Sequence, residues 1–192
     1  IDFSTRTVKP NLKSLNIIRI GTSGAVQEDI PIGSIMVSEY GIGLDSLMQY
    51  YQHQPSEDEH NILDDIKSHF YHFKGISPYI TAADTQLIET IGIGLERGIT
   101  VTAPGFYAPQ GRQVRAKASL PGLIDDIRLF STGKHRITNL EMETAGIYAL
   151  SRVLGHKALS VNAILASRLK FRFASNPGKI INQAIELVLS RL

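Results

Sequence analysis

Two glutamates stand on either side of a methionine in "NLEMETAG" (139–146), where a strand-like stretch of sequence passes into a helical one. In an extended chain side chains alternate between faces, so Glu141 and Glu143 would project to one side and Met142 to the other. A carboxylate at a strand end can accept hydrogen bonds from vicinal sugar hydroxyls, and a methionine offers a soft apolar surface to a sugar ring. A solvated strand end is the simpler interpretation of an isolated pair, so the rest of the chain has to decide between the two.

A candidate anion site follows the apolar stretch "NIIRI" (16–20), where "GTSGA" (21–25) places two glycines around two hydroxyl residues. Glycines let the backbone approach a ligand closely, successive N–H groups can form an anion-binding nest, and Thr22 and Ser23 add hydroxyl donors. Arg19, inside the apolar stretch, would be a costly buried charge unless an anion or a carboxylate pairs with it. The pattern predicts a phosphate-binding loop, and it is equally consistent with a tight turn beside a solvated arginine.

A third polar cluster follows "GITVTA" (98–103), in the loop "PGFYAPQGRQVR" (104–115). A flat polar heterocycle could stack on Phe106, while the amide of Gln110 donates and accepts at an imide edge and Arg112 donates to a carbonyl. Loop packing alone would explain the two aromatic residues. It would not particularly require Gln110 and Arg112.

These clusters each follow a predicted strand. Apolar stretches rich in branched residues predict strands at 16–20, 34–39, 98–103, 138–143 and 158–165. Helical spacing of apolar residues predicts helices at 59–73, 83–98, 144–156 and 176–192. Alternating strands and helices predict an α/β fold with three layers, in which helices flank a central, mostly parallel or mixed sheet. Ligands bind at the carboxyl ends of such strands, so one cleft could hold an anion, a pentose and a heterocycle: a nucleoside beside a phosphate.

Composition bounds the class of protein. With 192 residues, 43% hydrophobic and 20% charged, the chain is predicted to form one domain over residues 1–192. The formal net charge is only +2 and the densest basic run, "GRQVRAK" (111–117), lacks interleaved aromatics, so we expect no nucleic-acid partner. The absence of cysteine excludes disulfide scaffolds, thiolate zinc sites and cysteine nucleophiles, and it favours the cytoplasm. No apolar run approaches the ~20 residues of a membrane span, so we expect no membrane partner.

Two weaker patterns carry no expectation of a cofactor. His69 and His72 are one helical turn apart but have no convincing third ligand nearby, so we expect no metal site. Gly92, Gly94 and Gly98 loosely follow a dinucleotide-loop spacing, yet they lie within a predicted helix rather than after a strand. Packing glycines are the better interpretation.

Four motifs occur in the order and at the separations typical of one family: "RIGTSGA" (19–25), "GFYAPQGR" (105–112), "EMETAGIY" (141–148) and "LASR" (165–168). On these residues the chain resembles the nucleoside phosphorylases, and its uridine-cleaving members most, from about residue 16 to the C-terminus. The second motif is the most specific, because its phenylalanine, glutamine and arginine are spaced like those of a uracil-recognition loop.

The resemblance implies a role for each matching position. The phosphate contacts would come from Arg19, Gly21 and Thr22. The ribose contacts would come from Met142 and Glu143, with Glu141 in support. The base contacts would come from Gly24, Phe106, Gln110, Arg112, Leu165, Ala166 and Arg168. Arg19 and Arg112 would be the catalytic residues.

The implied reaction is reversible phosphorolysis of uridine to uracil and ribose 1-phosphate, with inorganic phosphate as co-substrate and no other cofactor. The family also implies a homo-oligomer, either a dimer or a hexamer. The alternatives are a purine nucleoside phosphorylase, a nucleosidase that uses water, and a silent relative that binds nucleosides without turnover.

Two departures from the family pattern qualify these expectations. Ser167 stands near the position where purine-specific members tend to have aspartate and uridine-specific members asparagine, so it argues against purines but weakens the match to uridine. The family's N-terminal strand, with a Gly-Asp phosphate loop and further phosphate-binding arginines, has no counterpart here. Because the sequence opens on Ile1 with a segment typical of a connection, we expect that an N-terminal portion precedes it.

Overall fold

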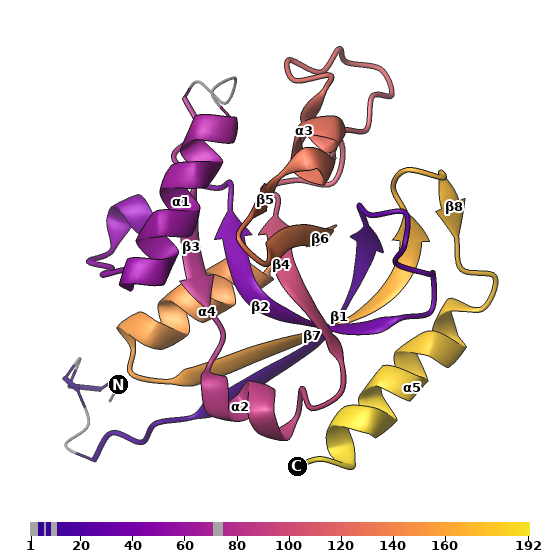
Figure 1. The fold of residues 1–192 in the computed structure, drawn as a ribbon. Helices are drawn as coiled ribbons and strands as arrows, with labels where there is room; N and C mark the ends of the chain where they lie inside the picture. The colour runs from indigo at the N-terminus through magenta and orange to yellow at the C-terminus, as the bar shows by residue number, and fades with distance from the viewer. Residues whose placement is uncertain (1–3, 6, 9–10, 71–74) are drawn as a thin grey trace.

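The computed structural model describes residues 4–5, 7–8, 11–70 and 75–192, and Figure 1 shows helices arranged around a strongly twisted sheet. The strands are β1 (Asn16–Ala25), β2 (Ile35–Gly43), β3 (Tyr79–Ala82), β4 (Glu96–Thr102), β5 (Ser131–Thr132), β6 (His135–Glu141), β7 (Lys157–Ser167) and β8 (Arg172–Phe173). The helices are α1 (Glu57–His69), α2 (Thr85–Thr90), α3 (Leu123–Leu129), α4 (Thr144–Val153) and α5 (Pro177–Leu189), with short 3₁₀ turns η1 (Leu47–Tyr50) and η2 (Ala108–Gln110). An α/β fold with a mixed sheet and flanking helices is therefore confirmed.

Five strands pair in a closed ring, which the sequence did not predict. β2 pairs with β4, β4 with β6, β6 with β1, β1 with β7, and β7 pairs back onto β2. The pairings β2–β4, β4–β6 and β1–β7 are parallel, whereas β1–β6 and β2–β7 are antiparallel. β3 adds to the ring beside β2, and β8 adds beside β7.

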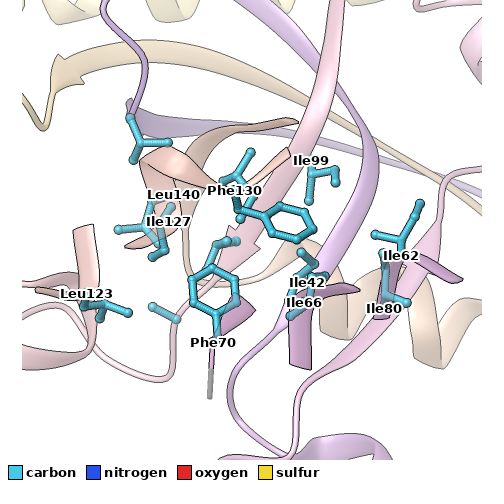
Figure 2. Packing of buried hydrophobic residues seen from close by; sticks show 14 of the residues in the cluster. Ile42, Ile62, Ile66, Phe70, Ile80, Ile99, Leu123, Ile127, Phe130 and Leu140 are labelled. Atoms are coloured by element: carbon cyan, nitrogen blue, oxygen red, sulfur yellow. The ribbon is translucent and has the colours of Figure 1, made fainter. Parts of the chain in front are cut away.

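Apolar side chains cover the outside of the ring. One cluster joins β2, β4 and β6 to α1 and α3, and Figure 2 shows Ile42, Ile66, Ile99 and Ile127 among its members. A second cluster lies against α2, α4 and α5 and includes Leu159 and other residues of β7. Each fully buried isoleucine or leucine contributes roughly 1.5–3 kcal/mol, so these two clusters hold the helices on the ring.

The inside of the ring holds a polar cluster beside the buried apolar residues Met36 and Ile164. Side chains on the inner faces of the five strands are buried and bond to one another: Ser23, Ser38, Thr100, Asn139, Ser160 and Asn162. Hydroxyl and amide groups run in a chain from Thr100 to Ser38 at 2.6 Å, and from Asn162 Nδ2 to Ser38 at 2.8 Å. Since an unpaired buried polar group is costly, these mutual hydrogen bonds stabilise the interior of the ring.

Several predicted element boundaries are wrong. The strand predicted at 16–20 continues to Ala25, because residues 21–25 pair with β7 and Gly24 and Ala25 also pair with β6. Neither the predicted loop nor a tight turn forms at 21–25, and an extended strand cannot form an anion nest.

The helix predicted at 83–98 is also wrong over most of its length. It ends at Thr90, Gly94 adopts a left-handed conformation with φ 72°, and β4 begins at Glu96. Gly92 does act as a packing glycine, since an added Cβ would lie 2.7 Å from the carbonyl oxygen of Ile88.

The strand predicted at 138–143 ends two residues early, at Glu141.

The helix predicted at 59–73 is α1, which begins at Glu57 and is assigned to His69. Residues 71–73, and His72 with them, lie outside the described residues.

His69 Nε2 donates to the carbonyl oxygen of Asp126 at 3.0 Å. Across the described ranges, no three His, Asp or Glu side chains come together in a way that could hold a metal ion. Within the same ranges, no helix has the length and apolar character needed to cross a membrane.

Candidate functional site

One cavity of about 600 Å³ opens at the ends of β1, β6 and β7. Every position that the family resemblance assigned to a ligand lines it: Arg19, Gly21, Thr22, Gly24, Phe106, Gln110, Arg112, Glu141, Met142, Glu143, Leu165, Ala166 and Arg168. Four further residues line it: Ser23, which the sequence suggested only as a hydroxyl donor to an anion, and three that were not predicted, Ile20, Leu140 and Phe173. The ends of three strands and one loop thus converge on a single hollow, and its volume falls in the range of small-molecule sites.

Arg19 lies at one end of the cavity, paired with both glutamates of the opening motif. Its Nη2 is 2.6 Å from Glu143 Oε2 and 3.1 Å from Glu141 Oε2. Its Nη1 donates to Asn162 Oδ1 at 3.0 Å and to Ser160 Oγ at 3.2 Å. Arg19 was expected to need an anionic partner, and two carboxylates fill that role. The glutamate motif at 139–146 and the segment at 19–25, which the sequence presented as separate clusters, therefore form one network.

Gly21 makes room for this network. Arg19 and Gly21 are two apart in β1, so they face the same side. The guanidinium of Arg19 lies directly over Gly21, where an added Cβ would come within 2.1–2.4 Å of Nη1, Cζ and Nη2. The first glycine of the motif therefore accommodates an arginine side chain rather than shaping a loop.

Glu141 is held in place by the start of α4. Its Oε1 accepts a hydrogen bond from the Thr102 hydroxyl at 2.6 Å. Its Oε2 accepts from the backbone N–H groups of Glu143 and Thr144 at 3.0 and 2.9 Å, and from the Thr144 hydroxyl at 2.9 Å. A carboxylate stabilises a helix N-terminus in this way, which explains why the strand ends at Glu141.

The two glutamates consequently differ in character. Glu141 is 4% exposed, so a solvated strand end is the wrong interpretation for it. The side chain of Glu143 is 53% exposed and carries a single described ion pair, to Arg19. Glu141 is built into the wall of the cavity, whereas Glu143 can exchange its partner for a ligand.

Phe106, Gln110 and Arg112 form the opposite end of the cavity. The Arg112 guanidinium carbon lies 3.8 Å from the centroid of the Phe106 ring. Arg112 Nη1 donates to the Phe106 carbonyl oxygen and to Gln110 Oε1, both at 2.5 Å. Because Gln110 Oε1 accepts from Arg112, the amide presents its Nε2 donor elsewhere. Burial lowers the pKa of Arg112 from its ordinary value.

Arg168 contacts the part of the cavity formed by Phe106, Gln110 and Arg112. Its Nη2 donates to the backbone carbonyl of Gln110. Its Cδ lies where a side chain on Gly24 would be, since an added Cβ there would approach it to 2.9 Å. Burial, and then the like charge of Arg112, lowers the pKa of Arg168 to about 10. Two guanidinium groups in a partly buried site favour a ligand with electron-rich oxygens.

Ser167 is buried and accepts a hydrogen bond from the backbone N–H of Lys170 at 3.2 Å. Several residues that hold the site were missed because they stand in stretches read only as buried strand or helix: Thr102, Thr144, Ser160 and Asn162. For Ser160 and Asn162, the signal is the period-two alternation of polar and apolar residues in "LSVNA" (159–163), which indicates a polar inner face.

A family model described as the phosphorylase superfamily matches residues 3–184. The chain therefore belongs to that superfamily. The resemblance to nucleoside phosphorylases is confirmed. A uridine phosphorylase from Thermococcus kodakarensis is 29% identical over 160 residues, which is 81% of this chain and 50% of the relative. A DeoD-type purine nucleoside phosphorylase from Actinobacillus pleuropneumoniae is 27% identical over 147 residues, or 76% of this chain and 48% of the relative.

Solved structures agree. The crystal structure of a Trypanosoma brucei nucleoside phosphorylase, described as showing uridine phosphorylase activity, superposes with a TM-score of 0.83 at 25% identity. That match covers 92% of this chain and 63% of the other. Isoform 2 of a Schistosoma mansoni uridine phosphorylase shares the fold, with a TM-score of 0.62 at 20% identity over 92% of this chain and 57% of the other. The chain spans about half the length of the curated relatives it matches.

Proposed function

We propose that the protein takes part in pyrimidine nucleoside salvage and catalyses reversible phosphorolysis of uridine to uracil and ribose 1-phosphate. One observation carries this proposal: Arg19, Glu143 and Gln110 line the same cavity of about 600 Å³. That space suits a nucleoside with a phosphate beside it. Had these residues lined separate hollows, no single nucleoside could have reached all of them.

In the proposed reaction, a phosphate oxygen forms a bond to the anomeric carbon of the ribose while the bond from that carbon to the base nitrogen breaks. The electron pair of the broken bond leaves with the base, so positive charge develops on the sugar and negative charge on uracil. Phosphate held by Arg19 and Thr22 offsets the charge on the sugar. The carboxylate of Glu143 accepts hydrogen bonds from the ribose hydroxyls, and Met142, exposed at the rim, packs on the ring.

The departing base is stabilised at the opposite end. Gln110 Nε2 and the guanidinium of Arg112 donate to uracil oxygens, as donors do in an oxyanion hole. Phe106 is 51% exposed, and its ring can take a base on its face once Arg112 turns toward the base edge. Leu165 and Ala166 line the remaining wall. No side-chain nucleophile is needed, and inorganic phosphate is the only co-substrate.

Charges indicate what must complete the site. Of the ionisable residues that line the cavity, three are arginines and two are glutamates, so the sum is +3 − 2 = +1. At the phosphate end, however, one arginine faces two carboxylates, which gives −1. A phosphate ion needs further cations there, so we propose that a neighbouring subunit or another segment of the protein supplies them. A homo-oligomer, dimeric or hexameric, would meet this requirement. We propose that the protein acts in the cytoplasm.

The experiment is release of uracil from uridine, followed by ultraviolet absorbance with and without phosphate, on the complete gene product. Arg112→Ala should lower kcat/KM about a hundredfold, or roughly 3 kcal/mol, by analogy with oxyanion-hole donors. Arg115→Ala is the matched control, because Arg115 is exposed on the same loop and is not among the residues lining the cavity. Undiminished turnover in Arg112→Ala would rule out its role at the leaving group.

The same assay tests the alternatives. Similarity to DeoD-type purine nucleoside phosphorylases makes a purine substrate the second candidate, and inosine in place of uridine tests it. Base release without phosphate would identify a nucleosidase. Tight uridine binding without turnover would identify a nucleoside-binding relative.

A further inference from the structure

Arg19 is anchored from inside the ring of strands, independently of the two glutamates. The side chain of Arg19 is 13% exposed, and its Nη1 bonds to two neutral acceptors on β7, Asn162 Oδ1 at 3.0 Å and Ser160 Oγ at 3.2 Å. Asn162 is fully buried, with 0% of its surface exposed. A buried amide in this place has no role as a ligand, because the guanidinium lies between it and the cavity.

The orientation of the Asn162 amide is fixed by its other end. Nδ2 donates to Ser38 Oγ at 2.8 Å, and Ser38 in turn bonds to Thr100 at 2.6 Å. With Nδ2 bound to the interior of the ring, Oδ1 has to point at Arg19. The polar interior therefore presents a preset acceptor to one nitrogen of the guanidinium.

This anchor matters because the other nitrogen has to change partners in the proposed reaction. Glu143 must release Arg19 Nη2 before phosphate can take its place on that nitrogen. An arginine side chain has many rotamers, and one held only by Glu143 and Glu141 would swing when Glu143 leaves. Hydrogen bonds from Nη1 to neutral acceptors persist through the exchange, because phosphate does not compete for them.

We propose that Asn162, with Ser160, is a positioning residue that keeps Arg19 aimed at phosphate. The proposal rests on the proposed function and adds to it a residue that touches no substrate. Its consequence is selective: removal of the Asn162 amide should weaken the use of phosphate and leave the nucleoside end of the cavity intact.

The experiment compares Asn162→Ala with Asn139→Ala in the complete protein. Asn139 is equally buried in the ring interior but bonds to Ser23, Thr100 and Thr138. In Asn162→Ala, the KM for phosphate should rise about tenfold, the loss expected for one hydrogen bond to a charged group. Its KM for uridine should stay within about twofold. Asn139→Ala should lower the melting temperature similarly and keep both constants near the wild type. Equal changes in both variants, or a rise in the uridine KM only, would overturn the proposal.

Coupling to Arg19 separates positioning from general damage. In an Arg19→Ala background, Asn162→Ala should no longer change the KM for phosphate, because the group through which it acts is gone. A tenfold change in both backgrounds would show that Asn162 acts by another route. If Asn162→Ala fails to fold, Ser160→Ala removes the other acceptor of Nη1 and is held to the same outcomes.

A readout without turnover keeps this inference distinct from the proposed function. With phosphate bound, nitrogen and proton NMR signals of the Arg19 guanidinium should show restricted rotation in the wild type and in Asn139→Ala, and averaging in Asn162→Ala. Unchanged Arg19 signals in Asn162→Ala would overturn the positioning role even in an active enzyme. Absence of phosphate-dependent turnover in a wild type that shows the expected Arg19 signals would instead reject the reaction and keep the anchor.

Discussion

Gly21→Ala tests whether the position of Arg19 is what the first motif provides. The new Cβ would lie 2.1 Å from Arg19 Nη1 and 2.2 Å from its Cζ, far inside contact distance. Gly21 sits in an extended strand paired with Asn162, a conformation that alanine adopts freely. The backbone can therefore stay, and the guanidinium of Arg19 has to leave.

The cost to stability should be modest. Displacement breaks the Nη1 bonds to Ser160 and Asn162 and the contacts with both carboxylates, each nominally worth about 1.5–3 kcal/mol. The displaced arginine regains water, and Glu141 keeps its bonds from Thr102 and the start of α4. The free energy of unfolding should consequently fall by only about 1–2 kcal/mol.

The cost to activity should be larger. Losing the cation at the phosphate end is comparable to losing a well-placed transition-state donor, so kcat/KM for phosphate should fall about a hundredfold, or roughly 3 kcal/mol. The assay is steady-state uracil release at varied phosphate, with melting temperature recorded on the same preparation.

Gly43→Ala is the matched control, because its Cβ would lie 2.2 Å from Cζ of Tyr79, outside the cavity. It should lower the melting temperature and keep kcat/KM near the wild type. If Gly21→Ala keeps its kcat/KM for phosphate within about twofold, Arg19 does not hold phosphate and the reasoning fails.

Three further predictions concern the scaffold. Ser56→Ala should lower the free energy of unfolding by about 1 kcal/mol in urea titrations, because Ser56 Oγ caps α1 through the N–H of Glu59; no change would mean that the cap adds nothing. Burial alone would raise the pKa of Glu59, but hydrogen bonds from Arg152 and backbone N–H groups hold it below its ordinary value of 4.5. This carboxylate therefore stabilises the fold above pH 4.5 and loses that contribution as the pH falls through 4.5 toward its folded pKa, so melting temperature should fall less steeply below pH 4.5 in Glu59→Gln than in the wild type; parallel curves would contradict it. Tyr148→Phe should cost about 2 kcal/mol in thermal unfolding, since the buried hydroxyl accepts from the N–H of Ser160 and donates to a carbonyl on β2, and an unchanged melting temperature would show that these groups find other partners.

The sequence was most informative where side chains do chemistry. Gln110, Arg112 and Glu143 were singled out because their types suit an imide edge and a sugar diol, and all three line one cavity. Ligand sites are expected at strand ends in an α/β sheet, but β1 and β6 pair antiparallel, so chain order alone could not place the ends of these two strands together.

The contacts between distant side chains and the boundaries of the strands were harder to predict from the sequence. The pairing of Arg19 with Glu143 joins residues 124 positions apart, and local spacing carries no record of it. Residues 21–25 read as a loop because glycine is rare in strands, but pairing with β7 outweighed that preference. Asn162 was passed over because the stretch 158–165 was interpreted as a buried apolar strand, although Ser160 and Asn162 alternate with apolar residues there. Only closure of the ring shows what that polar face contacts.

Closure of the ring also has a consequence for local opening of the protein. A sheet with two free margins can fray from either side, one strand at a time, whereas in the ring each of the five strands is clamped by two neighbours. Loosening β7 would release β1 and β2 together, and with them the hydroxyl and amide chain that crosses the middle. The walls of the cavity should therefore open to solvent as one unit, with backbone amides of β1, β2, β4, β6 and β7 exchanging their hydrogens at a common rate near that of global unfolding.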